Sequence, residues 1–190
     1  MVKRNYVEII KVLIEKQEEE LNIAKIARYS GIDYKNTYLT VKNLEKEGLI
    51  TLRSFGKNKK VILNKKIHPL IFEAEYERRK KLFKNKDFLL LYKRLFELPF
   101  SFIALLFGSH AKRKANKHSD MDLLTIGGDE KEINSIISLW PEKIHLTSVT
   151  YRDFIHMVKS KEFTVVSEAI KNNIILVGIE EYYRLLSNAE

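Results

Sequence analysis

Gly108 and Ser109 are adjacent residues whose types are suited to binding phosphate. Gly108 has no side chain to block a ligand, and Ser109 carries a hydroxyl group that can donate a hydrogen bond. They follow an apolar run at residues 102–107, which predicts a buried strand that ends in a tight turn. Glycine lets the backbone approach a triphosphate closely, and the N–H groups at the start of a following helix can donate to its oxygens. We therefore predict that both residues bind phosphate. Ser109 is expected to act as a donor and not as a nucleophile, because no base lies at nucleophile spacing.

Asp120 and Asp122 stand two residues apart at the start of a second predicted strand, residues 120–126. Side chains two apart on a strand point to one face, so the two carboxylates are presented together. Neighbouring carboxylates repel, and a hard divalent cation with oxygen ligands relieves that repulsion. The pair predicts a site for Mg²⁺, with Mn²⁺ as the alternative, that leaves coordination positions for phosphate oxygens.

Gly-Ser, a short helix and Asp-x-Asp on the next strand, with Ser119 before the first Asp, form one composite motif. It resembles the nucleotidyltransferase superfamily that includes polymerase beta, and within it the minimal nucleotidyltransferases of archaea and bacteria. The resemblance covers about residues 88–187. It departs at Arg113, where many relatives have Gly, while Lys112 matches the usual basic position.

The resemblance implies that this part of the chain binds an NTP with Mg²⁺ and transfers a nucleotidyl group, releasing pyrophosphate. The residues expected to bind the nucleotide are Gly108, Ser109, Lys112 and Ser119, and those expected to bind the metal are Asp120 and Asp122.

The family also supplies a third carboxylate from the strand equivalent to residues 143–149, and this chain has no acid there. Either His145 or Thr147 occupies the matching position, and the nearest acids, Glu142 and Asp153, lie outside the strand. A neutral imidazole at His145 could abstract a proton, and a lone His on a strand is also often structural. We carry His145 forward as the third catalytic candidate beside the two aspartates.

Composition and charge narrow the remaining function classes. A chain of 190 residues with 45% hydrophobic and 31% charged residues is typical of a folded soluble protein, and no run is long enough for a membrane span. Cysteine is absent, which excludes disulfides and cysteine zinc sites, and we expect a cytoplasmic location without a signal peptide.

Residues 1–66 hold 15 Lys and Arg against 8 Asp and Glu, so +7 of the net charge of +9 lies there. That asymmetry predicts a polyanion partner for the N-terminal third.

Residues 1–66 predict three helices followed by a basic hairpin. Asp33 is the expected N-cap of the third helix, whose buried stripe is predicted to contain Thr37, Val41, Leu44 and Gly48. Two alternating segments, 49–54 and 59–63, complete the pattern of a winged helix-turn-helix.

Residues 44–50, Leu-Glu-Lys-Glu-Gly-Leu-Ile, resemble the end of the recognition helix in MarR-like and ArsR-like winged-helix regulators. The resemblance implies that the third helix enters the major groove of double-stranded DNA. Lys25 and Arg28 are weaker phosphate candidates, and the alternative is a winged helix that contacts only proteins. The predicted contacts are Lys35, Asn36, Leu39, Lys42 and Asn43 on the helix, and Lys57, Lys59 and Lys60 on the wing.

Residues 67–87 predict an amphipathic connecting helix. It could form a homodimer seam through its Leu, Phe and Tyr residues, or it could pack on its own chain. The basic run from Arg78 to Lys81 predicts a solvated face.

The whole pattern predicts an α/β (α+β) protein with three parts. These are a winged helix-turn-helix at residues 1–66, a helical connector at 67–87, and a nucleotidyltransferase-like mixed sheet flanked by helices at 88–190. The leading hypothesis is a DNA-binding protein with an NTP-binding, Mg²⁺-dependent nucleotidyltransferase domain whose acceptor is unknown. The alternatives are a catalytically silent transcriptional regulator that senses nucleotide, and an antitoxin-like protein that pairs with a toxin.

Overall fold

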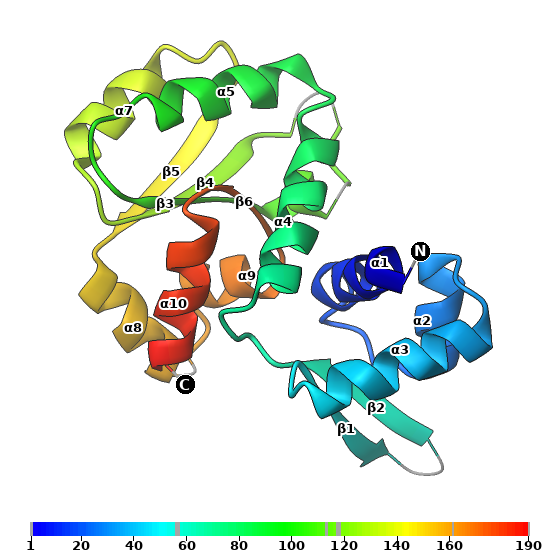
Figure 1. The fold of residues 1–190 in the computed structure, drawn as a ribbon. Helices are drawn as coiled ribbons and strands as arrows, with labels where there is room; N and C mark the ends of the chain where they lie inside the picture. Colours follow the sequence, from blue (N-terminus) through cyan, green and yellow to red (C-terminus); the bar gives the residue numbers. More distant parts are fainter. Residues whose placement is uncertain (1, 56–57, 113, 117–118, 161, 190) are drawn as a thin grey trace. The chain divides into compact units, whose positions relative to one another are not determined.

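A computed structural model of the chain describes residues 2–55, 58–112, 114–116, 119–160 and 162–189 (Figure 1). The chain divides into two compact units, Met1–Tyr76 and Glu77–Glu190. The boundary falls inside helix α4 (Pro69–Leu82).

Before the first part of α4, unit 1 contains three helices and an antiparallel hairpin, as the sequence predicts. Two of these helices begin at N-cap residues. The Asn22 side chain accepts a hydrogen bond from the Lys25 N–H at the start of α2, and the Asp33 side chain accepts one from the Asn36 N–H at the start of α3. Val41 and Leu44 of α3 are fully buried. The elements are α1 (Val2–Glu15), α2 (Ile23–Ser30), α3 (Tyr34–Lys46), β1 (Ile50–Phe55) and β2 (Asn58–Leu63).

The prediction that Gly48 belongs to the buried stripe of the third helix is wrong. Helix α3 ends at Lys46, and Gly48 lies beyond it with φ +69°. This left-handed residue turns the chain from the helix into β1, and glycine adopts that conformation at low cost.

The prediction of a solvated face from Arg78 to Lys81 is also wrong for its first two residues. Arg78 is only 3% exposed and donates to the carbonyl oxygen of Asn173 at 2.6 Å. Arg79 donates to the carbonyl oxygen of Leu176 at 2.7 Å, and its guanidinium lies 5.0 Å from the ring centre of Tyr92. These carbonyls belong to an edge strand, so the two arginines satisfy backbone acceptors that sheet pairing leaves open.

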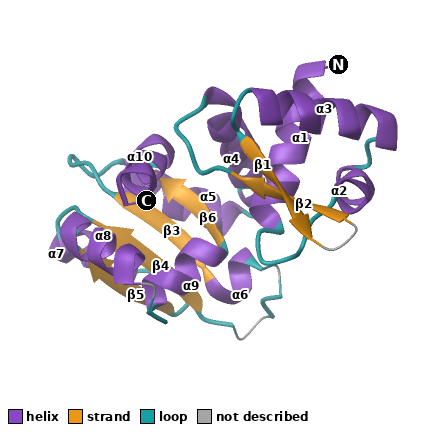
Figure 2. Cartoon of the chain, turned by 90° about the horizontal axis from the view of Figure 1, so that it is seen from below, coloured by secondary structure: helices purple, strands orange, loops and turns teal. Residues whose placement is uncertain are grey.

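Unit 2 is built on a four-stranded mixed sheet with the strand order β5-β4-β3-β6 (Figure 2). Strand β3 is antiparallel to both β4 and β6, whereas β4 and β5 are parallel. This confirms the mixed α/β fold class. The elements are α5 (Lys86–Phe96), β3 (Ile103–Phe107), α6 (Gly108–Ala111), β4 (Met121–Ile126), α7 (Glu130–Ser138), β5 (Ile144–Val149), α8 (Tyr151–Ser160), α9 (Val165–Lys171), β6 (Asn173–Val177) and α10 (Ile179–Ala189).

Helices cover the sheet of unit 2 on both faces (Figure 1). Helices α5 and α7 cover the face that carries Ala104, Leu106, Met121 and Leu123, and together these form one buried cluster. Helices α8, α9 and α10 lie over the opposite face. Strands β3 and β4 are buried between the two layers of helices. This burial fixes the end of β3, which Gly108 follows, and the start of β4, which Asp120 precedes.

No helix among the described residues is both long enough and apolar enough to cross a membrane.

Candidate functional site

The sheet register places Asp122 between Phe107 and His145. Phe107 pairs with Asp122 across the antiparallel β3–β4 ladder, and Asp122 pairs with His145 across the parallel β4–β5 ladder. Directly paired residues point to the same face of a sheet, so the Asp122 carboxylate and the His145 imidazole lie on one side. From sequence alone, either His145 or Thr147 could occupy this position, but Thr147 pairs with Leu124, two residues farther along the strand.

Gly108 lies directly against the Asp122 carboxylate. A Cβ atom at position 108 would overlap with Asp122 Oδ2, and Gly108 has φ +66°. Both the contact and the left-handed backbone require glycine here. The single turn α6 begins at this residue, with the Lys112 N–H donating to the Gly108 carbonyl at 3.1 Å. The Gly-Ser motif and the second Asp of the Asp-x-Asp motif are therefore in contact.

His110 joins the start of α6 to the end of the following loop. Its Nε2 lies 3.1 Å from the Ser119 carbonyl oxygen, and its ring lies edge-on to Phe88 at 5.6 Å between ring centres. The Ser119 hydroxyl accepts from the Asn116 N–H at 2.9 Å, so this predicted nucleotide-binding residue also closes a turn of its own loop. His110 therefore ties α6 to the residue directly before Asp120, a role that sequence reasoning missed. Nothing about a His after Gly-Ser indicates which carbonyl it meets.

One oxygen of Asp120 has two cationic or polar neighbours. His145 Nε2 lies 3.2 Å from Asp120 Oδ2, and Lys143 Nζ lies 3.3 Å from the same atom. The other ring nitrogen, His145 Nδ1, lies 3.9 Å from Asp122 Oδ1. The imidazole thus stands between the two carboxylates, with about half of its surface exposed. Lys143 was missed at the sequence level because the pairing of β4 with β5 is a tertiary feature.

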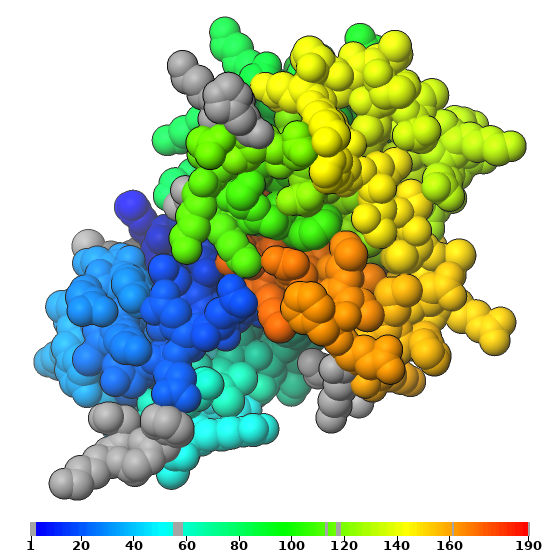
Figure 3. All heavy atoms as spheres, turned by 180° about the vertical axis from the view of Figure 1, so that it is seen from behind, coloured from blue at the N-terminus to red at the C-terminus, as the bar shows by residue number. Residues whose placement is uncertain are grey.

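Lys112, the predicted basic residue of the motif, forms an ion pair with α9. Its Nζ lies 3.5 Å from Glu168 Oε1. Figure 3 shows the surface of the α9 region, in orange, next to the green surface of the β3–α6–β4 region. The ammonium group of this predicted nucleotide-binding residue is therefore paired with a carboxylate of α9 in this structure.

The metal-binding capacity of this site rests on two carboxylates. Within the described residues, no group of three or more His, Asp or Glu is arranged to hold a metal ion. Mg²⁺ commonly takes only one or two protein carboxylates and completes its octahedron with water and substrate phosphates. The donor set of Asp120 and Asp122 fits that mode of binding and does not form a closed, all-protein site.

In unit 1, several of the predicted DNA-contacting side chains already have partners within the unit. Asn36 Nδ2 donates to Asp33 at 2.6 Å, and Asn43 Nδ2 donates to the Tyr6 hydroxyl at 2.9 Å. Lys42 pairs with Glu45 at 2.8 Å, a hydrogen bond that raises the pKa of Lys42 above its usual value.

The other predicted DNA-contacting residues of unit 1 differ in whether their side chains are exposed or lie near an acidic residue. Lys35 and Leu39 are exposed on α3, Lys59 is exposed on β2, and Lys60 lies 3.8 Å from Glu20. Lys57 lies outside the described residues. Tyr34 and Tyr38 are also exposed on α3, and sequence reasoning did not select them.

The comparison with protein families matches residues 101–182 to the family described as polymerase beta, nucleotidyltransferase. The matched segment contains β3, α6, β4, α7, β5, α8, α9, β6 and the start of α10, and it amounts to less than half of the chain. No curated protein and no solved structure matches the chain. The match supports the nucleotidyltransferase interpretation of unit 2, and its mixed sheet flanked by helices agrees with that fold. Members of this family usually use a divalent metal, which agrees with the donor chemistry of the two aspartates.

Proposed function

We propose that unit 2 binds a nucleoside triphosphate together with Mg²⁺ and transfers its nucleotidyl group to an acceptor hydroxyl. The observation that carries this proposal is the convergence of Gly108, Asp122 and His145. Glycine lies against the Asp122 carboxylate, and His145 is paired with Asp122 in the sheet. The family match at residues 101–182 supports the same reaction class.

The phosphate-binding part of the site comes from α6. Gly108 leaves room for the triphosphate, and the Ser109 hydroxyl and the first N–H groups of the turn can donate to its oxygens. Asp120 and Asp122 would hold the ion. When bound, Mg²⁺ neutralises the triphosphate charge and helps to align it for in-line attack.

The proposed role of His145 is to receive the proton of the acceptor. A neutral imidazole has one ring nitrogen with a free lone pair, and that nitrogen takes the proton as the acceptor oxygen attacks the α-phosphorus. The bond from the α-phosphorus to the bridging oxygen breaks, and pyrophosphate leaves with the electron pair. His145 Nε2 lies 3.2 Å from Asp120 Oδ2 and His145 Nδ1 lies 3.9 Å from Asp122 Oδ1, so this base would stand directly beside the two carboxylates that hold the ion.

Transfer of label from α-³²P-labelled NTP tests this proposal. The full-length protein would be incubated with each of the four NTPs, Mg²⁺ or Mn²⁺, and cell extract as a source of acceptors. Labelling of an acceptor that disappears in Asp122→Asn supports transfer. If His145→Ala lowers the rate by about two to four orders of magnitude, His145 is the base. Labelling that persists unchanged in Asp122→Asn contradicts the proposal.

A nucleotide sensor without turnover is the second candidate function. The observation that favours it is the sequence of β5, Ile-His-Leu-Thr-Ser-Val, which supplies no carboxylate beside Asp122. In that case NTP would bind with Mg²⁺, and no acceptor would be labelled under any of the conditions above.

For unit 1 we infer duplex DNA binding by a winged helix-turn-helix. The succession of three helices and the β1–β2 hairpin supports this inference, as does the +7 of net charge within residues 1–66. Because Asn36, Lys42 and Asn43 have partners within unit 1, the side chains most open to the groove are Lys35 and Leu39, with Tyr34 and Tyr38 beside them. The wing would contribute Lys57, Lys59 and Lys60 to backbone phosphates.

A further inference from the structure

We propose that Lys143 is a switching cation of the nucleotide site. It neutralises Asp120 while the metal is absent, and it moves to the triphosphate when metal and nucleotide bind. The inference rests on the proposed function of unit 2 and adds a residue that neither the Gly-Ser nor the Asp-x-Asp motif contains.

The backbone of Lys143 is fixed at the site. The Met121 N–H donates to the Lys143 carbonyl at 3.0 Å, which ties the residue before β5 to the first residue of β4. Because Met121 follows Asp120 directly, this bond holds Lys143 next to the first carboxylate of the motif. The position of Lys143 is therefore set by the sheet and does not depend on its side chain.

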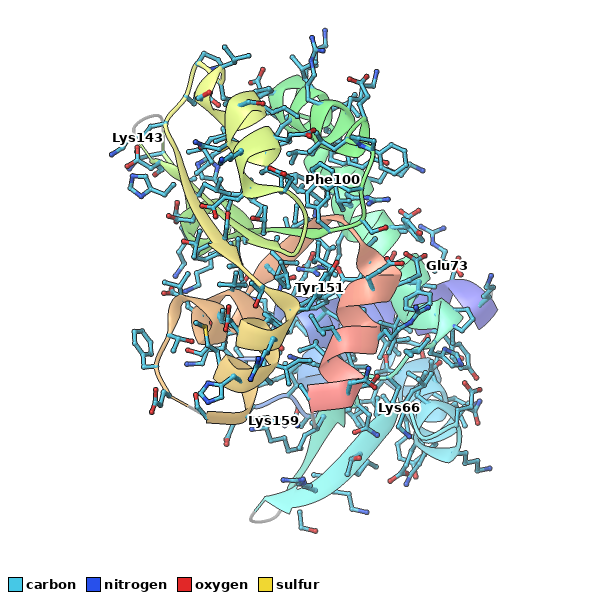
Figure 4. The ribbon with its side chains drawn as sticks, turned by 90° about the vertical axis from the view of Figure 1, so that its left-hand side faces the viewer. Lys66, Glu73, Phe100, Lys143, Tyr151 and Lys159 are labelled. Carbon is cyan, nitrogen blue, oxygen red and sulfur yellow. The ribbon has the colours of Figure 1, made fainter. Side chains whose placement is uncertain are left out.

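The side chain of Lys143, in contrast, is open to solvent. The side chain of Lys143, which is labelled in Figure 4, is 69% exposed, and its Nζ lies 3.3 Å from Asp120 Oδ2. An exposed Lys–Asp pair contributes little stability, because the two charges gain modest Coulomb energy in a high-dielectric setting. Lys143 would therefore release Asp120 at a small cost, and Asp120 would then be available to hold a divalent ion.

A displaced lysine has an anionic partner close by in the proposed complex. A lysine is a flexible point charge with three donors, and lysines commonly bind phosphates in that role. Lys112, the other lysine that the described contacts place at the site, is paired with Glu168 and is only 32% exposed on its side chain. Lys143 has the larger freedom to follow the triphosphate.

A switching role for Lys143 predicts that one substitution changes the affinities for Mg²⁺ and for Mg²⁺–NTP in opposite directions, which an ordinary surface ion pair does not. Lys143→Met removes the charge but keeps the length of the side chain. It is expected to bind Mg²⁺ alone up to about fivefold more tightly, because a competing exposed ion pair is lost. It is expected to bind each Mg²⁺–NTP about tenfold more weakly, because one charge-assisted phosphate contact is lost.

The experiment is isothermal titration calorimetry on the full chain with three probes: Mg²⁺ alone, each of the four NTPs at saturating Mg²⁺, and inorganic tripolyphosphate at saturating Mg²⁺. Lys143→Arg retains the charge and should restore NTP affinity to within about threefold of wild type. Lys131→Met is the control, because Lys131 is an exposed residue of α7, which follows the opposite end of β4. It should leave all three affinities unchanged.

The loss in Lys143→Met should be the same for tripolyphosphate as for NTP, since the lost contact is to phosphate and not to base or sugar. Equal NTP affinity in wild type and Lys143→Met overturns the inference while the proposed function stands. A change of Mg²⁺ and NTP affinities in the same direction also overturns it. If wild type itself binds no NTP with Mg²⁺, the proposed function fails, and this inference fails with it.

Discussion

Gly108 and Asp122 form a direct contact in which a glycine backbone and a carboxylate occupy adjoining space. A side chain at position 108 would overlap with Asp122 Oδ2. The contact links the turn after β3 to the second position of β4, so the proposed phosphate donors and one proposed metal ligand are held together by the backbone.

Replacing Gly108 with Ala should disrupt both the site and the local fold. The new Cβ would push Asp122 aside, and the left-handed backbone would be strained, at a combined cost of about 1–3 kcal/mol in the free energy of unfolding. Urea denaturation followed by circular dichroism measures the stability, and calorimetry should show the loss of Mg²⁺-dependent NTP binding.

Gly31→Ala is the matched control for this substitution. Gly31 has φ +69°, and no heavy atom lies within 4 Å of a Cβ at that position, so only the backbone strain of about 1–2 kcal/mol applies. NTP binding should be unchanged in Gly31→Ala. Unchanged NTP binding in Gly108→Ala would show that the Asp122 contact is not part of the site.

Arg78→Met should destabilise unit 2. The substitution leaves the Asn173 carbonyl without the guanidinium donor in a buried setting, which costs about 1–3 kcal/mol. Lys80→Met on the same helix removes an exposed charge and should change the free energy of unfolding by less than about 0.5 kcal/mol. Chemical denaturation of both variants compares them directly, and equal stabilities would contradict the role assigned to Arg78.

The stability of unit 1 should depend on the charge of Asp33 at low pH. Hydrogen bonds from the backbone and side chain of Asn36 hold the pKa of Asp33 below its usual value. A carboxylate with a depressed pKa in the folded state stabilises the fold above its unfolded pKa, about 4, and loses that contribution as pH falls through the folded value.

The Asn and Ala variants of Asp33 separate charge from capping. Thermal melting of Asp33→Ala should fall below wild type at pH 7, and the difference should shrink as pH drops from about 5 to 2. Asp33→Asn retains a capping oxygen without a titrating charge, so it should lie near wild type at pH 7. A wild-type advantage over Asp33→Ala that stays constant down to pH 2 would contradict the assignment.

DNA binding by unit 1 should depend on salt through its wing lysines. Replacing Lys57, Lys59 and Lys60 with Ala should weaken binding to all duplexes, and it should lower the slope of log affinity against log salt by about 2–3. Replacing the exposed residues Lys84, Lys86 and Lys93 of unit 2 removes the same charge and should leave the slope nearly unchanged. Fluorescence anisotropy at several salt concentrations measures both. Equal slopes in the two triple variants would refute DNA binding through the wing.

Local patterns in the sequence were enough to predict most of the helices and strands. Alternation identified β5, the apolar run before Gly108 identified β3, and the capping role of Asp33 was predicted correctly. These features depend on neighbours in the chain, which the sequence displays directly.

Features that depend on tertiary pairing could not be predicted in this way. The parallel register that brings His145 and not Thr147 opposite Asp122 is set by how β5 docks on β4. The burial of Arg78 depends on the edge strand β6, and the contact of Lys143 with Asp120 depends on the same docking as His145. A run of basic residues is typical of a solvated surface, and Lys80 fits that pattern. Arg78 and Arg79 depart from it because they donate to the distant carbonyl oxygens of Asn173 and Leu176 in β6.

Calorimetric titration of the full-length protein with each NTP, with and without Mg²⁺, tests the central claim most directly. Wild type should bind at least one NTP only when Mg²⁺ is present, and Asp122→Asn should abolish that binding while its circular dichroism spectrum stays unchanged. Asp129→Asn is the matched control, because Asp129 caps α7 at the opposite end of β4 and Asn can cap equally well. It should bind as wild type does. NTP affinity that is the same in wild type, Asp122→Asn and Asp129→Asn would contradict the account.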